Sequence, residues 1–225
     1  MKKQWWQIRK RFRVSFKKMI LWLRHFTYPV TAERLKKAKY ADLPAPLALE
    51  KITKGRDLIV EIGSGHGEVL LSNDATKSIS VGYETKTRFF KLTARKVKKR
   101  ADIFAFQGDA YESTLLHYVD NSISRLLILF PDPWHKRKHN KRRPITAQYL
   151  NAVAQKIKKG GLVLVATDWP DYAEFIEEQV KMVAENYHVV VKPYDPVDYG
   201  LPVTHFHQKW IRKGRKFTAF ELIKK

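Results

Sequence analysis

The sequence contains no cysteine in 225 residues. Disulfide bonds and metal sites built from thiolates are therefore excluded, and no metal site is predicted. A chain without cysteine suits a reducing compartment, so we expect a cytoplasmic protein.

The sequence also contains no apolar run long enough to form a membrane-spanning helix or the core of a signal peptide. The apolar stretch MILWL at 19–23 is far too short to cross a membrane, and charged residues stand on both sides of it. We therefore predict neither a secretory segment nor a membrane span.

Acidic residues are scarce relative to basic ones. Asp and Glu number 22 against 44 Lys and Arg, which gives a formal net charge of +22. Such an excess predicts a polyanionic partner, with nucleic acid the first candidate and an anionic membrane surface the second. The oligomeric state stays open between a monomer and a homodimer.

The first 45 residues differ in character from the rest of the chain. Residues 1–32 hold nine Lys/Arg and no acid, and their large apolar residues recur at helical spacing. This pattern predicts a basic amphipathic helix that either docks its aromatic stripe on the main domain or grips RNA, with membrane binding third. Pro44 and Pro46 mark a linker, so we expect an arm at 1–45 and a single α/β domain at 46–225.

The remainder alternates between two hydrophobic periods. Strand-like runs lie at 57–62, 78–83, 102–107, 123–130, 161–167, 188–193 and 216–223, and helical patterns lie from about 67, at 88–100, at 145–159 ending at Gly160, and at 171–186. Alternation of this kind predicts a doubly wound, mostly parallel sheet of seven strands. The last strand follows no obvious helix, which leaves room for an antiparallel orientation.

The first strand runs into a glycine-rich turn, EIGSGHG at 61–67. Gly63 and Gly65 permit close approach of a ligand to the backbone, beyond the carboxyl ends of the strands. A dinucleotide fingerprint needs a third glycine at position 68, where Glu68 stands. The acid at Glu61 instead suits a cationic ligand, so the turn favours S-adenosylmethionine over a nicotinamide cofactor.

Two further acids follow the next two strands. Glu84 can accept hydrogen bonds from ribose hydroxyls, and Asp109 is placed to meet an adenine amino group. Each of these acids could instead be a helix cap. Three acids at three successive strand ends nevertheless favour a cofactor site.

The fourth strand ends in Phe-Pro-Asp-Pro-Trp at 130–134. The two prolines are expected to push Phe130 and Asp132 into extended geometry, which would hold the Asp132 carboxylate stiffly at the cleft mouth. Asp168 ends the fifth strand, and the alternative for it is a helix N-cap. Two such carboxylates suit the donor edge of guanine and leave its N7, which carries a lone pair, facing a methyl donor.

Positive charge gathers directly after that strand. Residues 135–143 hold six Lys/Arg and two His, and residues 86–100 hold eight Lys/Arg without an acid. Cations of this kind hold phosphates and fix the register of a polynucleotide, whereas the pocket selects the base. A pocket rimmed by cations fits structured RNA with a splayed base.

The motifs FPDPWHKRKHNKRR, LVLVATDWPDYAEF and VEIGSGHG resemble those of the bacterial tRNA (guanine-N7)-methyltransferases, from about residue 56 to the end. The resemblance implies a Rossmann-like class I fold that uses S-adenosylmethionine to methylate a variable-loop guanosine of tRNA. It places cofactor contacts on Glu61, Gly63, Gly65, Glu84, Asp109 and Asp132, with Asp132 also catalytic. It places substrate contacts on Lys136 and Asp168, and RNA contacts on Lys138, His139, Asn140, Lys141, Arg142 and Arg143.

One motif departs from the family pattern. Where the family has Thr-Lys-Phe-Glu, this chain reads Thr204, His205, Phe206 and His207, all expected to lie in the substrate site. The change leaves two alternatives to an active tRNA methyltransferase: an RNA-binding paralogue with weakened catalysis, and an enzyme for a different RNA. An adenine amino-methyltransferase ranks lower, because its motif needs adjacent prolines, and a nicotinamide oxidoreductase ranks lower still.

Overall fold

A computed structural model describes residues 53–225 of the chain. The predicted arm and linker of residues 1–45 lie outside the described residues. The strands are β1 (Asp57–Ile62), β2 (Ser78–Glu84), β3 (Ile103–Gln107), β4 (Ile123–Leu129), β5 (Ile157–Thr167), β6 (Tyr187–Pro193) and β7 (Thr218–Lys224). The α-helices are α4 (Glu68–Leu71), α5 (Thr87–Val97), α6 (Ala110–Leu116), α7 (Ala147–Ala154), α8 (Pro170–Lys181) and α9 (His205–Ile211), and the 3-10 helices are η2 (Arg137–Arg142) and η3 (Pro196–Tyr199).

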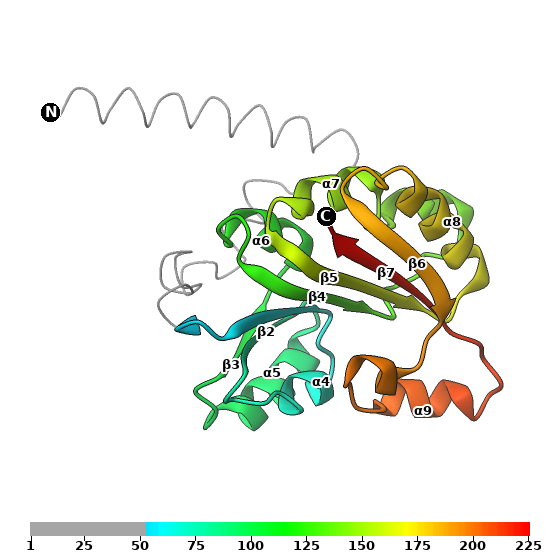
Figure 1. The fold of residues 1–225 in the computed structure, drawn as a ribbon. Helices are drawn as coiled ribbons and strands as arrows, with labels where there is room; N and C mark the ends of the chain where they lie inside the picture. Colours follow the sequence, from blue (N-terminus) through cyan, green and yellow to red (C-terminus); the bar gives the residue numbers. More distant parts are fainter. Residues whose placement is uncertain (1–52) are drawn as a thin grey trace, which may run out of the picture.

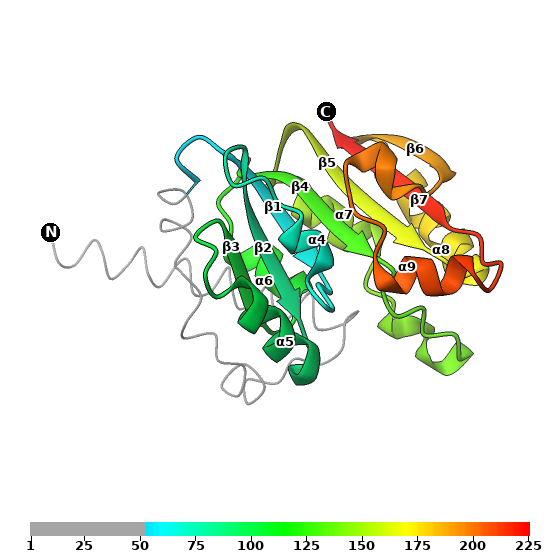
Figure 2. The same ribbon diagram turned by 90° about the horizontal axis from the view of Figure 1, so that it is seen from below.

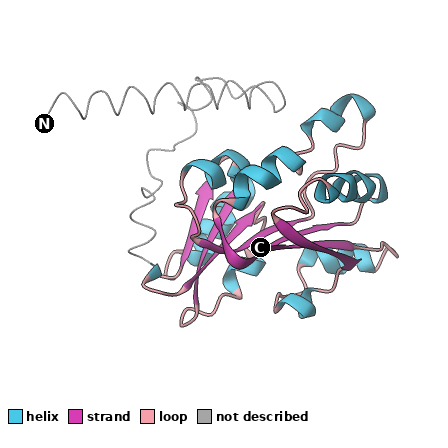
Figure 3. Ribbon diagram, turned by 45° about the horizontal axis from the view of Figure 1, so that its top comes forward, coloured by secondary structure: helices cyan, strands magenta, loops and turns pink. Residues whose placement is uncertain are grey.

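The strands form one twisted sheet with helices on both faces (Figures 1 and 3). Their order is β3-β2-β1-β4-β5-β7-β6, and every strand is parallel to the others except β7, which runs antiparallel to β5 and β6. The predicted seven-stranded, mostly parallel sheet is confirmed. The last strand, β7, lies between β5 and β6 and runs antiparallel to both, an orientation that the sequence pattern had left open. The short helix α9, which the pattern did not show, precedes it.

Apolar residues cover both faces of the central strands. Val60, Leu126 and Val163 pack in one core with residues of α6, α7 and α8, while Leu127 and Leu164 pack in a second core on the opposite face. Strands buried on both faces read as continuous apolar runs, which is why the sequence shows them so clearly. Within residues 53–225, no helix is long and apolar enough to cross a membrane.

Three predicted helix boundaries are wrong. The helix predicted at 145–159 ends at Ala154, and β5 begins at Ile157, which pairs with Ile123. Gly160 lies inside β5 with φ +73, where the register shifts, and does not end a helix. The helix predicted at 171–186 ends at Lys181, and the one predicted at 88–100 ends at Val97. The helix expected from about residue 67 does begin there, at Glu68. Apolar residues three or four apart fit a helix end and a strand start equally well, so periodicity could not separate them.

Two helices that border the site were not predicted. Asp109 caps α6 by accepting a hydrogen bond from Tyr111 N, and Thr204 caps α9 by accepting one from His207 N. Both helices have only seven residues. A helix this short carries too few turns for its apolar period to stand out from the loops beside it.

Candidate active site at the carboxyl edge of the sheet

The carboxyl ends of the parallel strands meet at one edge of the sheet, which we call the carboxyl edge. Ile62 of β1 lies beside Tyr83 of β2 and beside Ile128 of β4, so the residues that follow these strands emerge together. Ligands in doubly wound sheets bind beyond this edge. The sequence-predicted acids are brought to it by five neighbouring strands, β3, β2, β1, β4 and β5.

The glycine turn after β1 depends on left-handed backbone at three positions. Gly63, Gly65 and Gly67 have φ of +80, +50 and +74. A Cβ at Gly67 would strike Thr93, whereas a Cβ at Gly63 would meet nothing within 4 Å. Gly67 therefore permits close packing against α5, while Gly63 and Gly65 leave open space beside the turn that a ligand can approach.

Glu61 is a buried acid without a partner. It is 4% exposed, and its Oε2 atom makes no hydrogen bond within the described residues. Burial, together with the nearby carboxylates of Glu84 and Glu68, raises the pKa of Glu61 to about 8. A buried acid in this state is costly unless a cation joins it. The ammonium group of S-adenosylmethionine is such a cation, so the residues present fit this cofactor.

Glu84 and Asp109 are already organised by backbone groups. The Glu84 carboxylate accepts hydrogen bonds from Gly65 N at 3.0 Å and Lys86 N at 2.8 Å, which ties the glycine turn to the end of β2. Asp109 accepts from Tyr111 N at 2.9 Å. The helix-cap alternative thus describes Asp109, although a carboxylate that caps a helix retains lone pairs for a ligand.

The Pro-Asp-Pro loop is strained at both ends. The expectation that Pro131 holds Phe130 in extended geometry is wrong: Phe130 has φ +56, and Trp134 has φ +47. Left-handed backbone is unfavourable for bulky residues and costs on the order of 1–3 kcal/mol each. Asp132 therefore lies between two strained aromatic residues, and the loop depends on tertiary contacts for its shape.

Ring packing holds the first of these residues. Phe130 N donates to Ala166 O at 2.8 Å, and its ring stacks on Phe206 with centroids 4.9 Å apart. Tyr194 and Phe217 meet the same ring edge-on, each at 5.5 Å. These contacts tie the start of the Asp132 loop to α9 and to the segments on both sides of it.

Arg143 holds the other end of the loop, and the RNA contact expected of it is not what its geometry favours. Its side chain is 2% exposed, and its Nε donates to Pro133 O at 3.0 Å. It forms an ion pair with Asp171, and its guanidinium lies 5.0 Å from the Tyr172 ring. A buried guanidinium with these partners is turned away from solvent, so we expect it to position the Pro-Asp-Pro loop against α8 and not to bind a phosphate.

The other cations of the segment face solvent. Lys136, Arg137, Lys138 and Lys141 are exposed. Arg142 lies over the Trp134 ring at 4.9 Å, and His139 meets the same ring edge-on. Trp134 thus anchors the η2 segment, and the exposed cations remain suited to phosphates.

Replacing Arg143 with methionine is expected to lower stability by about 2–3 kcal/mol, through the lost hydrogen bond to Pro133 and the lost contacts with aromatic rings. Asp171 adds little to this cost, because its side chain is 60% exposed and water can solvate it. Thermal unfolding measures the change, with Lys141→Met as the exposed control. The salt dependence of RNA binding should weaken in the Lys141 variant only; an equal weakening in the Arg143 variant would make Arg143 an RNA contact after all.

Asp168 at the end of β5 is paired with a cation that the sequence analysis missed. It forms an ion pair with Arg215, whose guanidinium lies 3.6 Å from the Trp210 ring centroid. The N-cap alternative for Asp168 is wrong, because α8 has Trp169 at its N-cap and no side-chain cap. No pattern marks Arg215 in the sequence, since it stands among other cations in the loop before β7.

The segment that departs from the family pattern lies at the same edge. His205 N donates to both carboxylate oxygens of Glu68, at 3.0 and 3.2 Å, which ties α9 to the glycine-turn side of the site. His207 is 5% exposed, and its ring packs edge-on against Phe217 with centroids 4.5 Å apart. Burial lowers the pKa of His207, and its Nδ1 has no hydrogen bond within the described residues. The neutral ring belongs to the aromatic cluster around Phe130.

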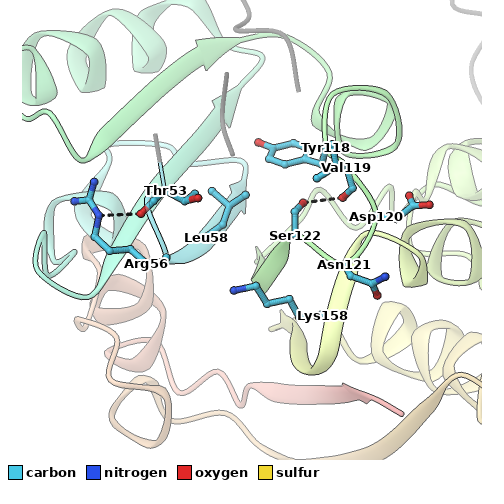
Figure 4. A pocket seen from close by; sticks show the side chains of 10 residues that line it. Thr53, Arg56, Leu58, Tyr118, Val119, Asp120, Asn121, Ser122 and Lys158 are labelled. Carbon is cyan, nitrogen blue, oxygen red and sulfur yellow. Dashed lines mark hydrogen bonds between the residues drawn. The ribbon is translucent and has the colours of Figure 1, made fainter. Parts of the chain in front are cut away.

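A cavity of about 170 Å³ lies elsewhere, at the amino-terminal edge of the strands (Figure 4). Tyr118, Ser122 and Lys158 line it, and Ser122 Oγ donates to Val119 O within its wall. None of the predicted site residues reaches this edge. The cavity is therefore separate from the cluster of acids.

Comparison with known proteins identifies the family. A family model described as putative methyltransferase matches residues 55–220. A tRNA (guanine-N(7)-)-methyltransferase of Wolbachia pipientis wMel is 34% identical over 82% of this chain and 83% of its own length. One of Alkalilimnicola ehrlichii is 32% identical over 70% of this chain and 68% of its own.

Solved structures show the same fold at low identity. The chain resembles an antibiotic-related methyltransferase with a TM-score of 0.56 and 17% identity, over 80% of this chain and 94% of that one. It resembles the 16S rRNA methyltransferase KamB with a TM-score of 0.56 and 13% identity, over the same shares. The sequence relatives and the family model together show that this chain belongs to the tRNA (guanine-N7)-methyltransferase family.

Proposed function

We propose that the protein transfers a methyl group from S-adenosylmethionine to N7 of a variable-loop guanine in tRNA, in the cytoplasm. The observation that carries the proposal is the buried, unpartnered carboxyl group of Glu61 beside the open glycine turn. It supports a cationic cofactor at the edge where Asp132 also lies. The tRNA substrate follows from what the relatives are named for.

The cofactor supplies an electrophilic methyl group on a sulfonium centre. Glu61 would bind its ammonium group, Glu84 its ribose hydroxyls and Asp109 its adenine amino group. The strained Pro-Asp-Pro loop presents Asp132 at the tip of the adjacent strand β4. Four acids on one edge would thus bind a cationic ligand and exclude an anionic dinucleotide.

Asp132 would act by position and charge. Guanine N7 has a lone pair in the ring plane, so it can attack a methyl group without losing a proton. The ring becomes cationic as the bond forms, and a carboxylate held nearby stabilises that charge. A rigid loop serves this role well, because a preorganised charge needs no rearrangement during the reaction.

Asp168 would accept hydrogen bonds from the donor edge of the base, but only after its ion pair with Arg215 is broken. Arg215 presents N–H groups to Asp168 and lies on the Trp210 ring. Guanine also presents N–H donors along one edge of a flat ring, and that ring stacks on aromatic side chains. Arg215 therefore occupies Asp168 much as the base would, and must move aside for that contact to form.

The second candidate is an RNA-binding protein with weakened catalysis. Two observations favour it: His207 is buried among aromatic rings where the family has a Glu, and Arg215 occupies Asp168. Both features concern binding of the base and leave the cofactor residues intact.

Nucleoside analysis separates the two candidates. Unmodified tRNA is incubated with the protein and a methyl donor, digested, and examined by mass spectrometry. We expect N7-methylguanosine, and it should be absent when the same tRNA carries adenosine at the target position. A protein that binds tRNA and forms no N7-methylguanosine would instead be the weakened paralogue.

A further inference from the structure

Helix α5 is strongly basic on the side that faces solvent. Exposed cations lie at Lys86, Arg88, Lys91, Arg95, Lys96, Lys98 and Lys99. No acid occurs between Glu84 and Asp102, and no ion pair in residues 53–225 involves any of these seven cations. Like charges this close repel one another, so binding of an anionic partner would neutralise them and stabilise the helix.

Four of these cations form a line along the helix. Arg88, Lys91, Arg95 and Lys98 follow one another at intervals of three, four and three residues, which places them on one face. At a rise of about 1.5 Å per residue, the line is roughly 15 Å long with a charge every 5 Å or so. We call this line the α5 stripe. Its regular spacing suits consecutive phosphates of a nucleic-acid strand.

The α5 stripe starts at the carboxyl edge. Lys86 N donates to Glu84 at 2.8 Å, directly before the first turn of α5. Lys96 Nζ donates to His66 O at 3.0 Å, and the Phe89 ring meets the His66 ring edge-on, so the helix is tied to the glycine turn. Figure 2 shows α5 on one flank of this edge and α9 on the other.

The buried residues of α5 argue against a membrane surface. Thr93 and Val97 are buried, and Val97 packs with Leu70 and Ile103 against the sheet. A helix that binds in a lipid interface presents large apolar residues beside its cations. The large apolar residues of α5 outside its core contact, Phe89, Phe90 and Leu92, are half-buried and not exposed, so electrostatic contact with phosphates is the interaction that the stripe favours.

From these observations we infer that the α5 stripe is a second phosphate-binding surface, separate from the η2 segment. It binds the backbone of the substrate RNA on the β2–β3 side of the carboxyl edge. The inference rests on the proposed function for the identity of the RNA. Two basic surfaces on either side of the acids would hold the polynucleotide across the site and would leave base selection to the acids.

The test is a triple substitution, Lys91→Ala, Arg95→Ala and Lys98→Ala. The matched control removes three exposed lysines from other faces: Lys77→Ala, Lys159→Ala and Lys181→Ala, of which the first two lie at the amino-terminal edge of the strands. Alanine favours helix at the α5 positions, and the control variant loses only the exposed ion pairs of Lys77 with Asp74 and of Lys181 with Glu177, so both variants should fold. Circular dichroism and the affinity for S-adenosylmethionine check that the fold and the cofactor site are intact.

Binding of tRNA is then measured from low to moderate salt. In the α5 variant the slope of log affinity against log salt should fall by roughly 2 to 3 units, at about 0.7–0.9 units per phosphate contact. The control should change it by well under one unit. Equal slopes for the two variants would overturn the proposal, as would binding of wild-type protein to phosphatidylserine vesicles that the α5 variant loses while its tRNA slope stays unchanged.

These binding measurements do not depend on catalysis. A wild-type protein that forms no N7-methylguanosine but shows the slope change would refute the proposed function and leave the phosphate surface standing. Normal methylation by the wild-type protein, together with an unchanged slope in the α5 variant, would support the proposed function and refute the phosphate-binding surface.

Discussion

Asp132→Ala is expected to reduce methyl transfer at saturating tRNA and cofactor by at least about 100-fold, the range found when a preorganised charge is removed from a transition state. The affinity for tRNA should stay within a factor of about three, because phosphate contacts determine it and those lie elsewhere. Initial rates of N7-methylguanosine formation and equilibrium tRNA binding measure the two effects. Asp132→Asn should lose nearly as much activity, since it keeps the shape of the side chain and removes the charge.

A matched control is Asp120→Asn, which removes one exposed carboxylate at the opposite edge of the sheet. It should leave the rate unchanged. The substitution also removes an ion pair with Lys156, but a surface ion pair contributes little to stability. If the Asp132 variants retain more than a tenth of the wild-type rate, Asp132 is not the group that stabilises the developing charge. The role would then pass to another acid of the carboxyl edge.

The sequence shows the acids of the site because of a simple geometric rule. Parallel strands that end at the same edge bring Glu61, Glu84 and Asp132 together, whatever the conformation of the segments that connect the strands. The strands themselves were visible because the central ones are buried on both faces. The fold and this half of the candidate site could therefore be predicted.

The rest depends on contacts between distant segments. Arg143 is buried because it meets Asp171 and Tyr172 of α8, some 28 positions away, and Arg215 reaches Asp168 across 47 positions. The left-handed φ of Phe130 contradicts its local preference before proline and exists only because an aromatic cluster encloses the ring. The run of cations at 136–143 predicts exposed side chains, and nothing in the run indicates that Arg143 is the one that is buried.

Glu61→Gln is expected to affect both cofactor binding and the pH dependence of stability. Burial and the nearby carboxylates of Glu84 and Glu68 raise the pKa of Glu61 from its ordinary 4.5 to about 8. In the unfolded chain Glu61 is ionised above pH 4.5, while in the folded protein it keeps its proton up to about pH 8. Folding is thus favoured at low pH, and this contribution is lost progressively between those two values.

Glutamine mimics the protonated acid and does not titrate. The melting temperature of Glu61→Gln relative to the wild type should therefore rise from about pH 5 to about pH 8 and stay constant above that. Thermal unfolding without cofactor across this range measures the difference. Glu112→Gln should change in the same direction, because burial also raises the pKa of Glu112. It should leave cofactor binding unchanged, because Glu112 lies on α6 and outside the glycine turn, and it is therefore the control for that measurement.

Binding of S-adenosylmethionine gives a second and independent readout. At pH 6.5 the amino group of the cofactor is cationic, and Glu61 must lose its proton to pair with it. Binding should therefore release up to about one proton, which calorimetry detects as a binding heat that differs between phosphate and Tris buffers. Glu61→Gln should release none and bind about 10- to 100-fold more weakly, because a hydrogen bond to a charged group contributes roughly 1.5–3 kcal/mol. Equal proton release by the two proteins would show that Glu61 is not the group that receives the ammonium, and the cofactor would then have to be held by Glu84 or Glu68.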